Sequence, residues 1–326
     1  MDISVIVVTY NQETTIARTL DSILSQRVGA DVEVIVGDDC STDGTETICR
    51  DYASRFPGRI IYLRREANMG VVGNYFDCVR RARGEFLADC AGDDFWTDPL
   101  KLQKQLDRLR SRPGVTMVAT DFLCRDVNTG ALSRHPHAPA PVGIETFARG
   151  QLFVPMLAQR RLIHLCTAMW RRQPLLDAMA AEPECFTDPA FTTEDLQIVL
   201  AMNAVGEIDV LPDITLNYSI GHASISHQPS FARQLAYSLR SVAQTRRLQM
   251  WLGVSDDDLR ANYTRLLDHM AAMAFRAGDA ELLRKFDDFR REMPFAPGPK
   301  GRAYVALTRN SLVWKAARHL IPQIHG

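Results

Sequence analysis

The chain has 326 residues, 46% of them hydrophobic and 24% charged, a balance typical of a folded globular protein. Its formal net charge of −1 excludes the strongly basic surface that holds nucleic acid. No window approaches the ~20 apolar residues of a membrane span, and the N-terminus shows no secretion signal. The seven cysteines are scattered and odd in number, which favours reduced thiols in a cytoplasmic protein.

The first two thirds of the chain alternate apolar, β-branched runs with amphipathic segments, at intervals of about thirty residues. Strands are predicted over 3–9, 32–36, 60–63, 115–122, 162–170 and 214–220, and helices over 16–24, 46–56, 74–83, 100–112 and 196–204. Such alternation is typical of βαβ units. It predicts an α/β fold with a mainly parallel sheet flanked by helices.

From Gln228 onward strand patterns vanish and helices are predicted over 231–252, 256–277, 279–291 and 302–320. We therefore predict two domains, residues 1–227 and residues 228–326. The last helix is basic and amphipathic, which leaves two alternatives open. It could attach the protein peripherally to an anionic membrane, or pack against the helical domain or a second copy of the chain.

An acidic pair organises the first domain. After Gly84 a short apolar run reads as a strand and ends at Gly92-Asp93-Asp94. Carboxylates at the end of a strand in an open α/β sheet lie where such sheets bind ligands. Two adjacent acids repel each other unless a cation or a hydrogen-bonding ligand compensates them. Taken alone, the pair could also be a helix cap beside a solvated neighbour.

Further polar clusters follow the other predicted strands. They are Thr9-Tyr10-Asn11, Gly37-Asp38-Asp39 and Asn68-Met69-Gly70, and a further cluster, Thr193-Glu194-Asp195, precedes the helix predicted over 196–204. Together with Gly92-Asp93-Asp94 they resemble, in order and spacing, the motifs of the family 2 glycosyltransferases, over about residues 1–225. The resemblance implies the GT-A fold and an inverting transfer from a UDP- or dTDP-sugar, with Asp94 on a divalent metal, Mn²⁺ or Mg²⁺.

The resemblance also assigns the nucleotide. Tyr10 is expected to stack on uracil or thymine, with Thr9 and Asn11 beside it. Asp39 is expected to accept the N3–H of the base, and Asp93 to bind the ribose hydroxyls. Asn68 and Gly70 are expected to line the same pocket, and we attribute Gly70 to a close approach of the backbone.

One departure from the family pattern concerns the metal. Many members have an acid at the position of Ala91, so one oxygen ligand is missing here. A histidine that follows the last core strand completes the metal site in related enzymes, and His222 has that position.

For catalysis the resemblance places the general base at Asp195. The start of a helix is expected to lower the pKa of Asp195, so positioning would matter more than basicity. Glu194 is expected to support the helix start or to face the sugars. Trp96 and Trp170 could stack on a sugar, although core packing explains either indole equally well.

Two alternatives remain beside glycosyl transfer. A sugar nucleotidyltransferase would need a glycine-rich loop with basic residues after the first strand, where this chain has Tyr10-Asn11-Gln12-Glu13. A non-catalytic nucleotide-sugar-binding domain is supported only by Ala91. The acceptor is expected to be a glycan, a lipid-linked sugar or a protein, in cell-surface polysaccharide synthesis at the inner face of the membrane.

Overall fold

The computed structural model describes residues 1–138, 141–221, 230–309 and 312–315. The chain divides into two compact units, Met1–His222 and Ala223–Gly326. Each unit is built around its own buried side chains. Among the described residues, every helix is too short or too polar to cross a bilayer.

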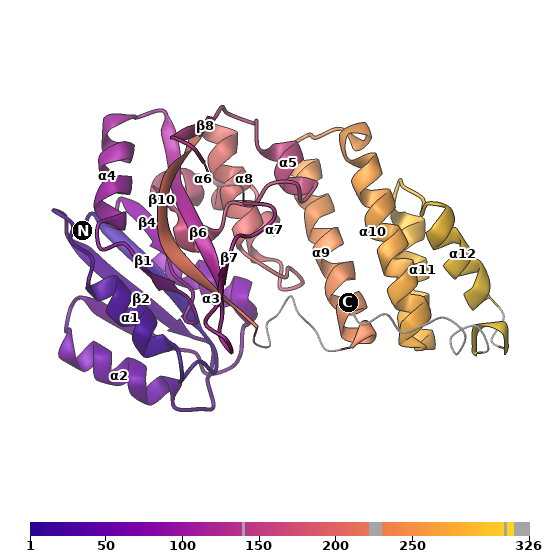
Figure 1. Cartoon of the computed structure of the whole chain (residues 1–326), viewed down its shortest axis with the longest axis horizontal. Helices are drawn as coiled ribbons and strands as arrows, with labels where there is room; N and C mark the ends of the chain where they lie inside the picture. Colours follow the sequence, from indigo (N-terminus) through magenta and orange to yellow (C-terminus); the bar gives the residue numbers. More distant parts are fainter. Residues whose placement is uncertain (139–140, 222–229, 310–311, 316–326) are drawn as a thin grey trace. The chain divides into compact units, whose positions relative to one another are not determined.

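The first unit is a mixed sheet with helices packed on it (Figure 1). Its strand order is β3-β2-β1-β4-β9-β6-β10-β5. The strands are β1 (Ile3–Thr9), β2 (Val32–Asp38), β3 (Ile60–Arg64), β4 (Phe86–Asp89), β5 (Phe95–Trp96), β6 (Val115–Asp126), β9 (Met169–Arg171) and β10 (Glu207–Ile220), with β7 (Leu132–Ser133) and β8 (Glu145–Phe147) at the margins.

Strands β1 to β4 run parallel, and β6 runs parallel to β10. Strand β9 lies antiparallel between β4 and β6. The predicted α/β class with a mostly parallel sheet is therefore confirmed. The helices of this unit are α1 (Ile16–Leu24), α2 (Thr45–Arg55), α3 (Gly70–Arg81), α4 (Lys101–Ser111), α5 (Phe153–Leu157), α6 (Arg172–Ala181), α7 (Glu184–Thr187) and α8 (Asp195–Val205).

The core explains why these segments fold as they do. In β1 the side chains of Ile3, Val5, Ile6 and Val7 are all fully buried, as expected for a strand covered on both faces. Helix α1 covers one face with Ile16, Leu20 and Ile23, which are buried at helical spacing. Burial of both faces fixes the strand positions, so the polar loops that follow β1, β2 and β4 meet at one edge of the sheet.

One predicted strand was wrong. Residues 162–170 do not form a continuous strand, because a short 3₁₀ turn, η1 (Leu165–Thr167), precedes the three-residue β9. The His164 ring nitrogen Nδ1 accepts the Cys166 N–H at 3.3 Å, and the Thr167 hydroxyl donates to the His164 carbonyl at 2.6 Å. These local bonds satisfy the backbone in place of a sheet ladder.

The second unit is helical throughout its described residues. It contains α9 (Phe231–Trp251), α10 (Asp256–Ala277), α11 (Ala280–Glu292) and α12 (Pro299–Thr308). Gly278 ends α10 with φ = 68°, a left-handed conformation that glycine adopts without a Cβ penalty. The helix predicted over 302–320 begins earlier, at Pro299, and α12 ends at Thr308, while 310–311 and 316–320 lie outside the described residues.

Candidate active site

The acidic loop after β4 is fixed against β1 and α1. Gly92 donates its N–H to Val8 O at 3.1 Å, and the Thr19 hydroxyl donates to Asp94 O at 2.6 Å. A Cβ on Gly92 would lie 3.1 Å from Thr9 Cβ and would displace the end of the Gln12 side chain, so glycine fits this close approach best. The loop therefore presents the two acids in a defined position at the end of β4.

The Asp94 side chain has the environment that best fits a metal ligand. Its side chain is 1% exposed, and Oδ1 accepts the Ser219 N–H at 2.8 Å. Its other oxygen, Oδ2, is buried and has no hydrogen-bond partner among the described residues. Burial, and next the charge of Asp93, raise the pKa of Asp94 well above its usual range. A buried carboxylate oxygen without a donor fits a metal ion, because the ion supplies the missing positive charge.

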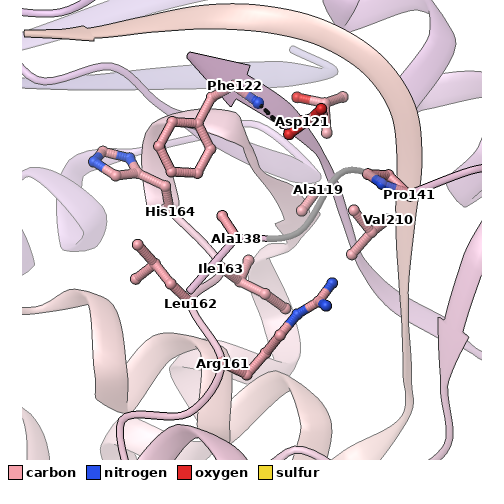
Figure 2. Close-up of a pocket in the computed structure, with 11 residues that line it drawn as sticks. Ala119, Asp121, Phe122, Ala138, Pro141, Arg161, Leu162, Ile163, His164 and Val210 are labelled. Carbon is pink, nitrogen blue, oxygen red and sulfur yellow. Dashed lines mark hydrogen bonds between the residues drawn. The ribbon is translucent and has the colours of Figure 1, made fainter. Parts of the chain in front are cut away.

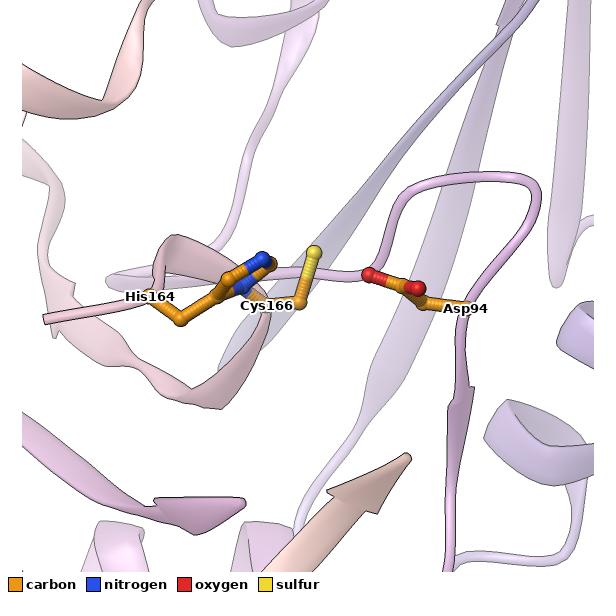
Figure 3. Close-up of side chains that lie close together, drawn as sticks. All are labelled: Asp94, His164 and Cys166. Carbon is orange, nitrogen blue, oxygen red and sulfur yellow. The ribbon is translucent and has the colours of Figure 1, made fainter. Parts of the chain in front are cut away.

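Two side chains from the η1 turn lie beside Asp94. One ligand atom each from Asp94, His164 and Cys166 lie within 4.8 Å of one another, and Figure 3 shows the three side chains facing one another. Burial, followed by the effect of His135, lowers the pKa of His164 to about 4, so its imidazole is neutral. Neutral imidazole is the form that binds metals.

In the loop after β2, Asp39 links its own loop to the end of β1 and to the segment before α3. Its N–H donates to Thr9 O at 3.0 Å, and its Oδ1 accepts the Met69 N–H at 2.7 Å. The Asn68 side-chain amide donates to Asp39 O at 3.3 Å. Asp39 Oδ2 accepts no hydrogen bond from the described residues. The structure thus brings together Thr9, Asp39 and Asn68, as the sequence predicts, and leaves one carboxylate oxygen for a ligand.

Tyr10 and Asn11 play different parts. Tyr10 is 48% exposed at the end of β1, so its ring is accessible to a planar base. Asn11 has a positive φ of 52° and uses Oδ1 to accept the Thr42 N–H at 2.8 Å. In this structure Asn11 ties the β1 loop to the β2 loop.

Gly70 needs a different explanation from the one the sequence suggested. It opens α3 with φ = 75°, and a Cβ built there meets nothing within 4 Å. Glycine is therefore favoured here because the backbone is left-handed. No other described group approaches closely enough to exclude a side chain. The Gly70 N–H donates to Asn68 Oδ1 at 3.1 Å, which holds the segment next to Asp39.

Glu194 and Asp195 stand at the start of α8, as predicted. Glu194 is 9% exposed and Asp195 is partly exposed. The expectation for basicity was wrong, because burial, and next the negative charge of Asp89, raise the pKa of Asp195 to about 7. The charge of Asp195 also contributes to the raised pKa of Tyr218, as do Asp94 and Asp93, which indicates that these groups border one region.

The two indoles belong to the interior. Trp96 is 4% exposed and donates its Nε1–H to Cys166 O at 3.0 Å, while Trp170 is fully buried. Their burial favours core packing over sugar stacking. His222, predicted as a metal ligand, lies outside the described residues.

A small cavity lies behind His164, between β6, β10 and the segment that leads into η1 (Figure 2). Its volume is about 20 Å³, and Asp121, Phe122 and Arg161 are among its lining residues. Such a volume holds about one water molecule. It is therefore too small to be a sugar subsite.

The sequence did not single out several residues that shape this site. The Arg18 guanidinium donates to Asp93 O at 3.3 Å and the Ser219 hydroxyl donates to the same oxygen at 2.7 Å. Cys166 donates its thiol proton to Asp89 Oδ1 at 3.1 Å. The spacing His-x-Cys at 164–166 is a local signal that points to the η1 turn.

The family model described as Glycosyl transferase family 2 matches residues 4–173 of the chain. The uncharacterized protein Rv1520 of Mycobacterium tuberculosis is 38% identical over 178 residues, which are 55% of this chain and 49% of Rv1520. The match thus spans about half the length of that relative.

Two solved structures share the fold. Staphylococcus aureus TarS 1–349, solved in complex with UDP-GlcNAc, superimposes with a TM-score of 0.56 at 17% identity, covering 99% of this chain and 93% of that one. The mannosyltransferase PcManGT of Pyrobaculum calidifontis, in complex with GDP-Man and Mn²⁺, gives a TM-score of 0.53 at 18% identity, covering 97% and 86%.

Proposed function

We propose that this chain, which belongs to glycosyl transferase family 2, is an inverting glycosyltransferase that moves a sugar from a UDP- or dTDP-sugar to an acceptor hydroxyl. The observation that carries the proposal is the buried, unpartnered Oδ2 of Asp94, at the sheet edge where the β1, β2 and β4 loops meet. An oxygen in that position is well placed to bind a divalent cation, which would also neutralise the charge of a nucleotide diphosphate.

The nucleotide would lie across the ends of β1 and β2. Tyr10 offers an exposed ring to the base, and Asp39 Oδ2 is available to accept the N3–H of uracil or thymine. Asp93, next to the metal ligand, would bind the ribose hydroxyls.

Asp94 would hold a divalent ion, Mn²⁺ or Mg²⁺, which when bound neutralises the charge that develops on the departing diphosphate. The donor set fits, because Asp94 supplies a buried carboxylate oxygen that no other group of the described residues satisfies. The PcManGT complex contains Mn²⁺, so at least one protein with this fold binds a divalent metal.

Asp195 would act as the general base. Its carboxylate takes the proton of the acceptor hydroxyl while that oxygen attacks C1 of the donor sugar, and the bond from C1 to the diphosphate breaks on the opposite face. A single displacement of this kind converts an α-linked donor into a β-glycoside. A pKa raised to about 7 suits a base that works near neutral pH.

The acceptor would be a hydroxyl of a cell-surface glycan or its lipid-linked or protein precursor. All seven cysteines are free thiols, which supports a reducing compartment and hence a cytoplasmic site of action.

The proposal is tested with the full chain and a panel of UDP-, dTDP-, GDP- and ADP-sugars in the presence of Mn²⁺. We expect thermal stabilisation and slow release of nucleotide with UDP- or dTDP-sugars only. Binding without any release of nucleotide, with or without sugar acceptors, would support the non-catalytic alternative instead. Release of pyrophosphate from a nucleoside triphosphate and a sugar phosphate would support the nucleotidyltransferase.

A further inference from the structure

We propose that Cys166 and His164 bind the same divalent ion as Asp94, which makes this a transition-metal site that discriminates against Mg²⁺. The inference rests on the proposed function only in taking Asp94 as a metal ligand. It adds a sulfur and a nitrogen ligand, and it assigns the preference of the site among ions.

The geometry brings three different donor atoms together. The carboxylate, imidazole and thiol ligand atoms lie within 4.8 Å of one another, and Asp94 and Cys166 are both buried (Figure 3). Bonds of ~2.0–2.3 Å to one ion place two ligand atoms at most about 4.6 Å apart. Small side-chain rotations therefore suffice to bring all three onto one ion, and Asp94 Oδ2 has no competing partner among the described residues.

The turn that carries His164 and Cys166 is held rigidly. Trp96 Nε1 donates to Cys166 O at 3.0 Å, and Gln105 Nε2 donates to Thr167 O at 2.7 Å. Gln105 is itself fixed by the buried Lys101, whose Nζ donates to Gln105 Oε1 at 2.9 Å. Ligands mounted on a fixed backbone lose little freedom when an ion binds, which favours tight binding.

The sulfur has one donor and one acceptor beside it, and without an ion, burial and the nearby carboxylates keep it a thiol by raising the pKa of Cys166. Cys166 Sγ accepts the Ala91 N–H at 3.2 Å and donates its proton to Asp89 Oδ1 at 3.1 Å. When the sulfur binds an ion the proton leaves, and Asp89 Oδ1 is placed to receive it. The Ala91 N–H remains on the sulfur and stabilises its negative charge. Ala91 offers no side-chain oxygen, and the Cys166 sulfur would supply a ligand in its place.

The donor set decides which ions bind. Mg²⁺ is a hard ion that prefers oxygen ligands in an octahedral arrangement. Thiolate and imidazole favour transition metals, in the order Mn²⁺ below Co²⁺ below Zn²⁺. We therefore expect Mg²⁺ to bind more weakly than any of these three ions.

The test titrates Co²⁺ alone into the full chain and records its absorption. A cobalt–thiolate bond gives a charge-transfer band in the near ultraviolet. We expect this band in the wild type, its loss in Cys166→Ala and Cys166→Ser, and its retention in Cys90→Ala. Cys90 is a matched control, because its thiol is also buried nearby but contacts the main-chain oxygen of Asp94, at 3.8 Å.

Calorimetry supplies the second readout. Zn²⁺ should bind the wild type at least about 100-fold more tightly than Mg²⁺, and Cys166→Ser should reduce that ratio by at least about 10-fold. Serine retains a hydroxyl donor for Asp89, so this variant remains informative if Cys166→Ala does not fold.

The outcomes separate the two proposals. Co²⁺ binding that Asp94→Asn abolishes, without a charge-transfer band, overturns the sulfur ligand and leaves the metal on Asp94. An unchanged Zn²⁺ to Mg²⁺ ratio in Cys166→Ser overturns it equally. If no divalent ion binds, and UDP-sugar turnover persists in EDTA, the metal of the proposed function fails together with this inference.

Discussion

The main-chain N–H of Ser219 on β10 donates to Asp94 Oδ1 at 2.8 Å, across 125 positions of sequence. This bond occupies one oxygen of the carboxylate and leaves Oδ2 without a partner among the described residues. Strand β10 thus orients the Asp94 carboxylate in the loop after β4. The first prediction follows from that orientation.

Asp94→Asn should preserve the loop and remove the metal dependence of nucleotide binding. The asparagine oxygen can still accept the Ser219 N–H, but the side chain no longer carries a charge. We expect the gain in UDP affinity on adding Mn²⁺ to fall at least about 10-fold, measured by calorimetry. Asp93→Asn is the comparison, because it should weaken UDP binding while the response to Mn²⁺ remains. Equal Mn²⁺ responses in wild type and Asp94→Asn would contradict this prediction.

Asp39→Asn should reduce selectivity for uracil. The structure leaves Asp39 Oδ2 for the N3–H of the base, and a hydrogen bond to a charged group is worth about 1.5–3 kcal/mol. UDP affinity should therefore fall by about 10- to 100-fold, with GDP affinity little changed. Asp43→Asn is a suitable control, since the Asp43 carboxylate is already occupied by the N–H groups of Thr45 in its own loop and Glu13 in the segment after β1. Wild-type protein that binds GDP as well as UDP would refute the assignment of the base pocket.

Asp195→Asn should abolish transfer while donor binding stays near the wild-type value. A base acts only in the transition state, and its loss costs typically ~10²–10⁴-fold in rate. Asparagine is tolerated at the start of a helix, so α8 should persist. Glu194→Gln removes the adjacent acid and should retain most of the activity. The product of an α-linked donor should be a β-glycoside by NMR, and retained configuration would rule out Asp195 as the base of a single displacement.

The rate should depend on pH through Asp195. Its raised pKa, about 7, means that the carboxylate is protonated, and inactive as a base, in acid. We expect kcat/KM to rise with pH until about pH 7 and then to level off. The residual activity of Asp195→Asn should lack this rise. A profile that is flat between pH 5 and 8 in the wild type would argue against Asp195 as the ionising group.

Asp89→Asn should stabilise the fold at high pH. Burial raises the pKa of Asp89 to about 6, so the folded protein binds this proton more tightly than the unfolded chain. Stability is therefore lost as pH rises from about 4 to 6, by up to about 3 kcal/mol. Asparagine removes that penalty and keeps an oxygen for the Cys166 thiol. Urea unfolding should show that Asp89→Asn raises the free energy of unfolding at pH 8 and changes it little near pH 4. Equal increases at both pH values would contradict the raised pKa of Asp89.

Local pattern was sufficient for the regular part of the fold. The buried run of β1 and the apolar stripe of α1 were predictable, because strand and helix periodicities appear directly in the order of apolar residues. The segment 162–170 was not, because the bonds of His164 and Thr167 within the η1 turn compete with a strand of equal apolar character.

For the site, the sequence alone determined which carboxylates stand at the ends of elements, since Asp39 and Asp94 follow strands and Asp195 begins a helix, each in a recognisable motif. Only the tertiary structure decided their chemistry. The raised pKa of Asp195 comes from burial and from Asp89, more than a hundred positions away in sequence. The sulfur beside Asp94 belongs to the η1 turn, which precedes β9, and β9 lies between β4 and β6 in the sheet. Desolvation and ligand geometry depend on which groups the folded chain brings together, and no local pattern of residues encodes that.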